Sequence, residues 1–511
     1  MQKKIFYPYL FAIYPTLALL AHNIEEIKIQ AAYRSLAISL VVSLLIFWLL
    51  GRLLKSRSKA ALITTLTCVL FFSYGQVYNY LELAQPLGLT LGRHRLLLPV
   101  WLLLFAVGVL WALRQKRDLF QLHSALNLAA VILLIFPLAE IGLFGFRSLT
   151  ASVAEAPAAA AASELSLPSD QPAPDIYYII LDAYSRDDTL LENYRLDNRP
   201  FLEELESLGF YVARCSQSNY AQTQLSLVSS LNMNYLPALG DEFQPGNTSR
   251  VRIGELIHHN AVRRLLESIG YTSVAFETGF KGTQWEDADI YLSPTNNQLA
   301  AAQLLGGMTS FEEMLVRTSA GLAAIDSASA LPKMLQPDLS NPKRIHRDLV
   351  LFVLDQLRKM PGKSSPKLVF AHLVIPHPPY VFEADGSFVD YDKPDNPGYQ
   401  DQITYLNRIL IPLLKEMIER SPSPPIIILQ ADHGAINAPP NKRLNILNAY
   451  FLPNDGKEAL YPNISPVNTF RLIFNQYFDG NYELLEDTAY FSVYSRPYDF
   501  TIIPNKRPGC P

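Results

Sequence analysis

The sequence predicts a five-helix transmembrane anchor followed by an α/β domain with a doubly wound, mostly parallel sheet. Long apolar segments fill the first third of the 511 residues, and short apolar runs alternate with amphipathic stretches after residue 174. The charge is divided in the same way. Residues 1–150 hold 14 Lys and Arg against 5 Asp and Glu, a net charge of +9, which leaves −13 on the rest of a chain whose total is −4. A domain of that acidity argues against a nucleic-acid binder.

The anchor is predicted from five apolar segments, each close to the length of about 17–25 residues that a spanning helix needs. They cover residues 5–21, 36–54, 60–78, 96–113 and 125–146. Lys and Arg gather before the first segment, between the second and third, and after the fourth. The positive-inside rule puts these clusters in the cytoplasm, so five spans would place residue 147 onward outside it.

Two features border the second domain. Glu140 lies near the outer end of the fifth segment, and we interpret it as reaching the membrane interface, with a functional intramembrane acid as the alternative. Residues 151–174 are rich in Ala, Pro and Ser without apolar periodicity, which is typical of a tether. The predicted parts are therefore a transmembrane domain at 1–150, a linker at 151–174 and an extracytoplasmic domain at 175–511.

Continuous apolar runs predict the buried strands of this domain, at 176–181, 272–276, 367–374 and 425–429. Ligands of a doubly wound sheet bind beyond the carboxyl ends of the strands. The polar residues at these ends are Asp182, His372 and His377 in HLVIPHPPY, and Asp432 and His433 in ADHG. A lone Asp after a strand is more often a helix cap, but a buried Asp and His cluster is costly without a cation. Their convergence therefore favours a metal site.

A nucleophile is predicted at Thr223. The segment 218–231 begins as an irregular stretch and continues as a helix, and Thr223 lies in the first turn of that helix. There the backbone N–H groups and the helix dipole favour a bound phosphate or sulfate. A hydroxyl next to a metal can lose its proton and attack such an anion. The alternative is that Thr223 only caps the helix.

In this order the motifs resemble the alkaline-phosphatase/sulfatase superfamily: ILDAY after a strand, T-x-x-S opening a helix, PHPPY, and DHG after a buried strand. With its apolar first third, the chain resembles lipoteichoic acid synthases and phosphoethanolamine transferases in particular. The resemblance implies one divalent metal (Mn²⁺, Mg²⁺ or Zn²⁺) held by Asp182, Thr223, Asp432 and His433. It also implies that Thr223 is the nucleophile and that His377 contacts the transferring group or protonates the leaving oxygen. His372 is expected to be a packed histidine.

The chain departs from the family pattern at several positions. The membrane transferases usually have Glu where this chain has Asp182, and sulfatases usually have a second Asp where it has Ala183. The C-x-P-x-R motif of formylglycine sulfatases is missing, since Cys215 begins CSQSN. The extra Asp-x-x-x-His of two-zinc phosphodiesterases is also not evident. The sequence therefore argues against a formylglycine sulfatase and for one metal.

Two smaller features leave alternatives open. Cys215 and Cys510 both lie in the outward domain, where they could pair or remain free thiols. Lys442 and Arg443, soon after Asp-His-Gly, are interpreted as part of a solvated loop. The alternative is that they meet an anionic substrate.

Together these features predict a membrane-anchored, metal-dependent, sulfatase-like enzyme that transfers or hydrolyses phosphate-ester headgroup linkages outside the cytoplasm. The expected substrate is a lipid or glycan of the cell envelope, because five spans are more than a tether requires. No nucleic acid and no protein partner is expected. The alternatives are a phosphodiesterase or sulfatase-type hydrolase with a soluble substrate, and a non-catalytic binding module on the same fold.

Overall fold

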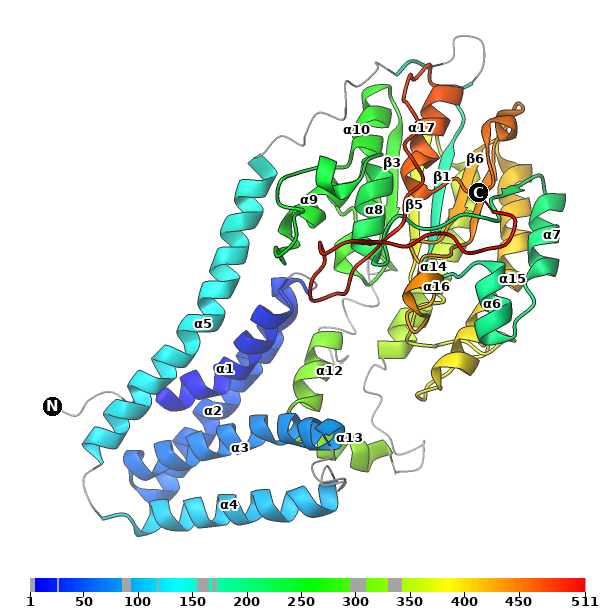
Figure 1. Ribbon diagram of the computed structural model, residues 1–511. Helices are drawn as coiled ribbons and strands as arrows, with labels where there is room; N and C mark the ends of the chain where they lie inside the picture. Colours follow the sequence, from blue (N-terminus) through cyan, green and yellow to red (C-terminus); the bar gives the residue numbers. More distant parts are fainter. Residues whose placement is uncertain are drawn as a thin grey trace. The chain divides into compact units, whose positions relative to one another are not determined.

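The chain divides into two compact units (Figure 1). The computed structural model describes residues 5–24, 27–84, 93–116, 119–153, 165–167, 172–294, 309–329 and 342–510. One unit comprises Met1–Arg147 and Ala302–Pro342, and the other comprises Ser148–Ala301 and Lys343–Pro511. Most of the predicted linker at 151–174 lies outside the described residues, and the predicted domain boundaries remain a prediction.

The first unit is built from helices. In chain order they are α1 (Tyr7–His22), η1 (Ile29–Ala32), α2 (Tyr33–Leu54), α3 (Arg57–Ala84), α4 (His94–Arg114) and α5 (Phe120–Val153). Among the described residues, four stretches are long and apolar enough to cross a membrane: Ile29–Leu54, Arg57–Glu82, His94–Arg114 and Phe120–Phe146. Many of their large apolar side chains are exposed, which is typical of a surface that faces lipid.

The expected count of five spans is not confirmed, because α1 differs from the other four. It has 16 residues and is about 24 Å long, which is shorter than the hydrocarbon core of about 30 Å. Pro8 lies in its first turn and Pro15 lies within it. Glu140 is exposed on α5, and nothing in its surroundings separates the two interpretations of this residue.

Two short helices from the middle of the chain belong to the first unit: α12 (Ser310–Arg317) and α13 (Gly321–Ser329). The guanidinium of Arg34, at the start of α2, donates to the carboxylate of Glu312 on α12, with 2.5 Å between Nε and Oε1. No sequence pattern singled out this segment, because its contacts are made with residues almost 300 positions earlier.

The second unit is an α/β domain around a seven-stranded mixed sheet with the order β2-β7-β6-β1-β5-β3-β4. β6, β1, β5, β3 and β4 run parallel, whereas β7 pairs antiparallel with β6 and β2 antiparallel with β7. The strands are β1 (Ile176–Leu181), β2 (Tyr211–Val212), β3 (Thr272–Phe276), β4 (Ile290–Leu292), β5 (Lys367–Leu373), β6 (Ile426–Gln430) and β7 (Asn448–Phe451). The parallel centre matches the expectation, and the antiparallel edge makes the sheet a mixed one.

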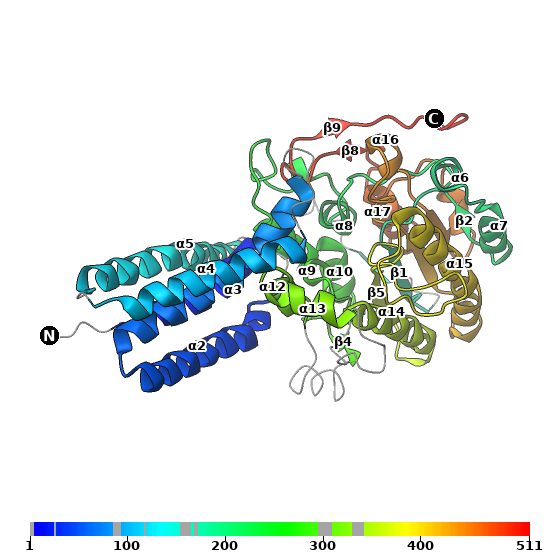
Figure 2. The same cartoon turned by 90° about the horizontal axis from the view of Figure 1, so that it is seen from below.

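Helices cover both faces of this sheet (Figure 2). One layer contains α6 (Asp187–Tyr194), α7 (Arg199–Ser207), α14 (Pro342–Lys359) and α15 (Asp395–Arg420). The other contains α8 (Thr223–Leu231), α9 (Val251–His258), α10 (Ala261–Ser268) and α17 (Pro466–Tyr477). Alternate residues of β1 enter the two cores, and all six are buried. Burial on both faces explains why this strand is a continuous apolar run.

The register of the central strands brings their carboxyl ends together. Ile180 of β1 pairs with His372 of β5 on one side and with Gln430 of β6 on the other. The residues that follow these positions therefore meet at one edge of the sheet, which is where the candidate site lies.

Candidate active site

Three segments bring the candidate residues to this edge. Asp182 follows β1 directly, Asp432 and His433 follow β6 after one residue, and Thr223 is the first residue of α8. Asp182, Asp432 and His433 are buried, and each offers one ligand atom within 4.8 Å of the other two. The structure thus brings together the four residues that the sequence predicted as metal ligands.

His433 directs one ring nitrogen toward this cluster. Its Nδ1 donates to the carbonyl oxygen of Gly434 (2.7 Å), which can only accept. Nε2 is the nitrogen that faces the other candidate residues. It lies 3.2 Å from the hydroxyl of Thr223, 3.7 Å from Oδ1 of Asp182 and 3.5 Å from Oδ2 of Asp432.

Among the described residues, neither carboxylate of the cluster finds a donor for one of its buried oxygens. Asp432 uses Oδ1 to accept from the backbone N–H groups of Ala183 (3.0 Å) and His433 (2.9 Å), but Oδ2 has no donor in the described part of the chain. The same holds, within those residues, for Oδ1 of Asp182. Buried carboxylate oxygens without a donor are costly unless a cation lies between them. The residues therefore fit one divalent ion with oxygen and nitrogen ligands.

The electrostatic surroundings favour the charged form of Asp182. Burial disfavours that form, but nearby imidazoles outweigh burial and hold the pKa of Asp182 well below its usual range. The strongest attraction comes from His377, followed by His372 and His433. Asp182 is therefore ionised at neutral pH.

The hydroxyl of Thr223 does not cap its helix. The N-cap of α8 is Gln222, without a side-chain capping bond, and the Thr223 hydroxyl instead faces His433. At this position the hydroxyl stands beside the N–H groups of the first turn of α8, which have no partner within the helix and favour an anion. This arrangement suits a nucleophile next to a bound phosphate.

The two histidines of HLVIPHPPY occupy different positions. His372 is buried within β5, where Nδ1 lies 2.8 Å from the hydroxyl of Thr283 and Nε2 lies 3.3 Å from Oδ2 of Asp182. His377 follows the strand, and its backbone N–H donates to the carbonyl oxygen of Asp182 (3.1 Å). Nδ1 of His377 donates to the carbonyl of Pro378 (2.5 Å), which leaves Nε2 for another partner.

A fourth histidine near the site, His346, was not predicted from the sequence. His346 lies on α14, and its buried Nε2 has no hydrogen-bond partner in the part of the chain that the structure describes. Burial, together with repulsion from His377, lowers its pKa to about 4, so the ring is neutral at physiological pH. No strand-end motif marks His346, because α14 reaches the site only when it packs on the sheet.

The two outward cysteines are paired. Cys215 and Cys510 form a disulfide with Cα atoms 5.6 Å apart across 295 residues of sequence. The bond fastens the C-terminal strap, residues 483–510, to the segment just before α8. Within the strap, β8 (Tyr490–Phe491) pairs with β9 (Thr501–Ile502).

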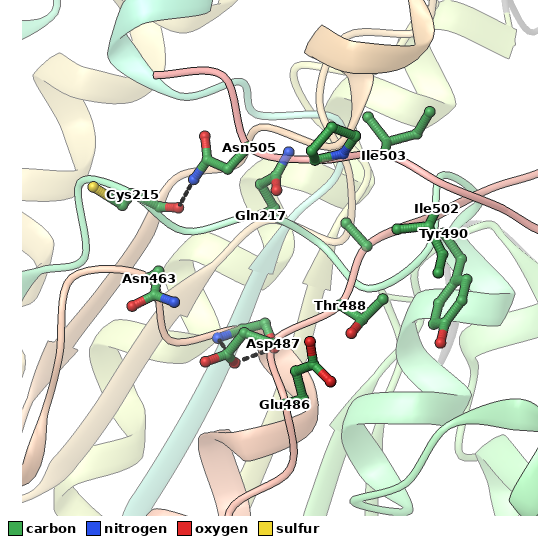
Figure 3. A pocket seen from close by; sticks show the side chains of 13 residues that line it. Cys215, Gln217, Asn463, Glu486, Asp487, Thr488, Tyr490, Ile502, Ile503 and Asn505 are labelled. Atoms are coloured by element: carbon green, nitrogen blue, oxygen red, sulfur yellow. Dashed lines mark hydrogen bonds between the residues drawn. The ribbon is translucent and has the colours of Figure 1, made fainter. Parts of the chain in front are cut away.

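A pocket of about 330 Å³ lies between this strap and the segment before α8 (Figure 3). Its polar lining includes Gln217, Asn463, Glu486, Thr488 and Asn505, and the Asn505 amide donates to the carbonyl of Cys215 (2.7 Å). The described residues contribute no Lys or Arg to the lining of this pocket, so it does not suit a phosphate group. A phosphate is better accommodated at Thr223.

No protein-family model matches the chain, and no curated protein matches it. Solved structures similar to it include the C-terminal periplasmic domain of EptC from Escherichia coli, at 14% identity and a TM-score of 0.40, covering 67% of this chain and 96% of that one. Another is the integral membrane protein lipooligosaccharide phosphoethanolamine transferase A from Neisseria meningitidis, at 11% identity and a TM-score of 0.41, covering 92% and 94%. A third is an alkaline phosphatase superfamily protein from Vibrio parahaemolyticus, at 12% identity and a TM-score of 0.38, covering 69% and 81%. These are the kinds of protein that the sequence motifs resemble.

Proposed function

We propose that this chain is a membrane-anchored, metal-dependent enzyme that transfers or hydrolyses a phosphate-ester linkage outside the cytoplasm, with Thr223 as its nucleophile. One observation carries the proposal. The Thr223 hydroxyl, Nε2 of His433 and the unpaired oxygens of two buried aspartates converge at the first turn of α8. This set of groups can hold a cation, activate a hydroxyl and receive an anion.

A divalent cation in this cluster would lower the pKa of the Thr223 hydroxyl and offset the charge that develops on the phosphoryl oxygens. The Thr223 hydroxyl loses its proton to water, and Oγ1 forms a bond to phosphorus while the bond to the leaving oxygen breaks. His377 gives a proton to the leaving oxygen, and a phosphothreonine remains. An acceptor hydroxyl or water then gives its proton to His377 and attacks phosphorus. The Thr223 oxygen leaves and takes up a proton from water, which restores the enzyme.

Two features support an extracytoplasmic site. The basic loop that joins α2 to α3 is cytoplasmic by the positive-inside rule, and three spans after it place residue 147 on the opposite side whether or not α1 crosses the membrane. The disulfide between Cys215 and Cys510 is typical of proteins in oxidising compartments.

The helices of the first unit support a substrate that lies in the membrane. Four candidate spans are more than a tether needs, since a single helix already holds a domain at a bilayer. We therefore propose that the donor or acceptor is a lipid-linked or glycan-linked headgroup of the cell envelope.

The test is the intact mass of the full chain in vesicles of phosphatidylethanolamine and phosphatidylglycerol, supplied with Mn²⁺ or Zn²⁺. We expect a covalent adduct that maps to Thr223, whose mass identifies the transferred headgroup, with about one metal ion per chain. Thr223→Ala removes the adduct. The matched control, Thr404→Ala on an exposed turn of α15, keeps it.

The other outcomes separate the alternatives. Bound metal with no adduct, together with hydrolysis of a soluble diester to an alcohol and a phosphomonoester, would favour the soluble-substrate hydrolase. Absence of metal, adduct and hydrolysis would overturn the enzymatic proposal and leave the non-catalytic binding module.

A further inference from the structure

Arg443, the last residue of α16 (Pro440–Arg443), joins the two loops that form the site. Its Nε donates to the carbonyl oxygen of Ala221 (2.9 Å), two residues before Thr223. Its Nη1 donates to the carbonyl oxygen of Ile436 (2.7 Å), three residues after His433. The same guanidinium therefore braces the nucleophile segment against the loop that follows β6.

One edge of this guanidinium is not used by the protein. Among the described residues, no hydrogen bond of Nη2 and no ion pair of Arg443 with a carboxylate is present. Burial lowers the pKa of the guanidinium, and the charges of Asp432 and Asp182 act in the opposite direction. An arginine stays protonated in this situation. The guanidinium of Arg443 is therefore a positive charge that lies near both aspartates without an ion pair to either. It still has N–H groups that can donate to another partner.

The neighbouring lysine is placed differently. The ammonium of Lys442 forms an ion pair with Glu192 (2.6 Å), whose side chain is 60% exposed. The sequence placed both basic residues in one solvated loop, and Lys442 does pair with a carboxylate at the surface. Arg443 is turned toward the loops of the site.

The charge balance of the site explains what Arg443 adds. Two ionised aspartates and a divalent ion sum to no net charge, so the metal cluster alone offers little net attraction to an anion. A guanidinium presents planar N–H donors that match the oxygens of a phosphate. The first turn of α8 supplies N–H groups on the other side of the nucleophile.

We propose that Arg443 binds a non-bridging oxygen of the phosphoryl group through Nη2 while its other two donors hold the loops around Thr223, and so selects anionic phosphate esters as substrates. This inference rests on the proposed function, and it assigns a substrate-binding residue outside the metal cluster. The role requires that the side chain contact the anion itself, beyond bracing two backbone segments.

The test measures the affinity of inorganic phosphate for the full, metal-loaded chain in detergent by titration calorimetry. The rate of hydrolysis of bis(p-nitrophenyl) phosphate is a second readout. We expect Arg443→Met to weaken phosphate binding and raise KM by about ten- to a hundredfold, the effect of losing a hydrogen bond to a charged group. Arg443→Lys restores part of the affinity. The matched control, Lys442→Met, stays within about twofold of the wild type, since an exposed ion pair contributes little.

Three outcomes would contradict the inference. The first is a wild-type chain that does not bind phosphate, and the second is a Lys442→Met variant that loses as much affinity as Arg443→Met. The third is an Arg443→Met variant with unchanged phosphate affinity and a lower kcat or melting temperature, which would show a bracing role alone. The variant Thr223→Ala tests the proposed function separately from the role of Arg443. If this variant still hydrolyses the diester, the proposed function is wrong, whatever the result for Arg443.

Discussion

The hydroxyl of Thr223 lies 3.2 Å from Nε2 of His433, although 210 residues separate them in the chain. Two packing relationships produce this contact. β6 lies beside β1 in the sheet, and α8 packs on the sheet face that contains Ile426 and Ile428 of β6. The N-terminus of α8 thereby meets the carboxyl end of β6, where His433 follows.

This contact predicts that Thr223 is replaceable only by another hydroxyl. We expect Thr223→Ala to lower turnover of a phosphodiester at least about a thousandfold, the scale of losing a nucleophile. Thr223→Ser keeps the hydroxyl and should retain measurable turnover and the covalent adduct. Steady-state kinetics and intact mass measure both effects, and turnover by the Ala variant at the wild-type rate would contradict the role of Thr223.

The buried oxygens without donors predict opposite effects of Asp432→Asn with and without metal. The amide oxygen still accepts from the backbone of Ala183 and His433, and the new N–H₂ group can donate to Asp182. Thermal melting of the chelated variant should therefore occur at or above the wild-type temperature. Added Mn²⁺ or Zn²⁺ should raise the melting temperature of the wild type but not that of the variant.

If added metal raised the melting temperature of Asp432→Asn as much as that of the wild type, the ion would bind elsewhere. Metal content measured on both proteins after gel filtration provides the control, and we expect about one ion per wild-type chain and none per variant chain.

The buried ring of His346 predicts a loss of stability on mild acidification. Its pKa is about 4 in the folded chain, against an ordinary value of 6.5. Between these pH values the unfolded chain takes up a proton that the folded chain does not. Lowering the pH through this window therefore destabilises the fold, by up to about 1.4 kcal/mol for each pH unit.

Melting curves of the chelated chain from pH 7 to pH 4 measure this slope. His346→Gln should flatten it relative to the wild type. His258 also has a pKa lowered by burial, so the difference between wild type and variant is the readout. Identical slopes would mean that His346 titrates normally.

The disulfide predicts a redox-dependent stability of the second unit. Removing a bond that closes a long loop costs about 2–5 kcal/mol. We therefore expect dithiothreitol to lower the melting temperature of the wild type. The variant Cys215→Ser with Cys510→Ser should melt at that lower temperature with or without the reductant. A reductant effect that persists in the double variant would point to another target.

The orientation of the helices predicts which engineered cysteines a membrane-impermeant maleimide reaches in intact cells. Ser387→Cys, in the second unit, should be labelled, whereas Ser56→Cys, in the basic loop between α2 and α3, should react only after lysis. The reverse pattern would place the site in the cytoplasm. The wild type is the background control, because Cys68 is buried and the other two cysteines are paired.

Much of the second unit could be predicted from local sequence. The four apolar runs matched β1, β3, β5 and β6, because a strand buried on both faces has a continuous apolar pattern. The antiparallel edge was not predicted, since β7 and β2 are short and their partners are distant in the chain. The count of five spans is not confirmed, because α1 is apolar but its 16 residues are few for a bilayer.

Chain order and apolar patterning alone place Asp182, Asp432 and His433 at the ends of the strands, without any knowledge of packing. How these residues meet, which oxygens remain unpaired, and which further side chains approach all depend on the packing of the folded chain. His346 carries no local signal, and the position of Arg443 after Asp-His-Gly left open whether it lies in a solvated loop or meets an anion. Both depend on which side of a helix or loop faces the site, and only packing settles that. The pairing of Cys215 with Cys510 was open for the same reason, as it depends on where the C-terminal strap returns. Distances between segments remote in sequence follow from strand order and helix packing, and the local pattern of residues does not contain them.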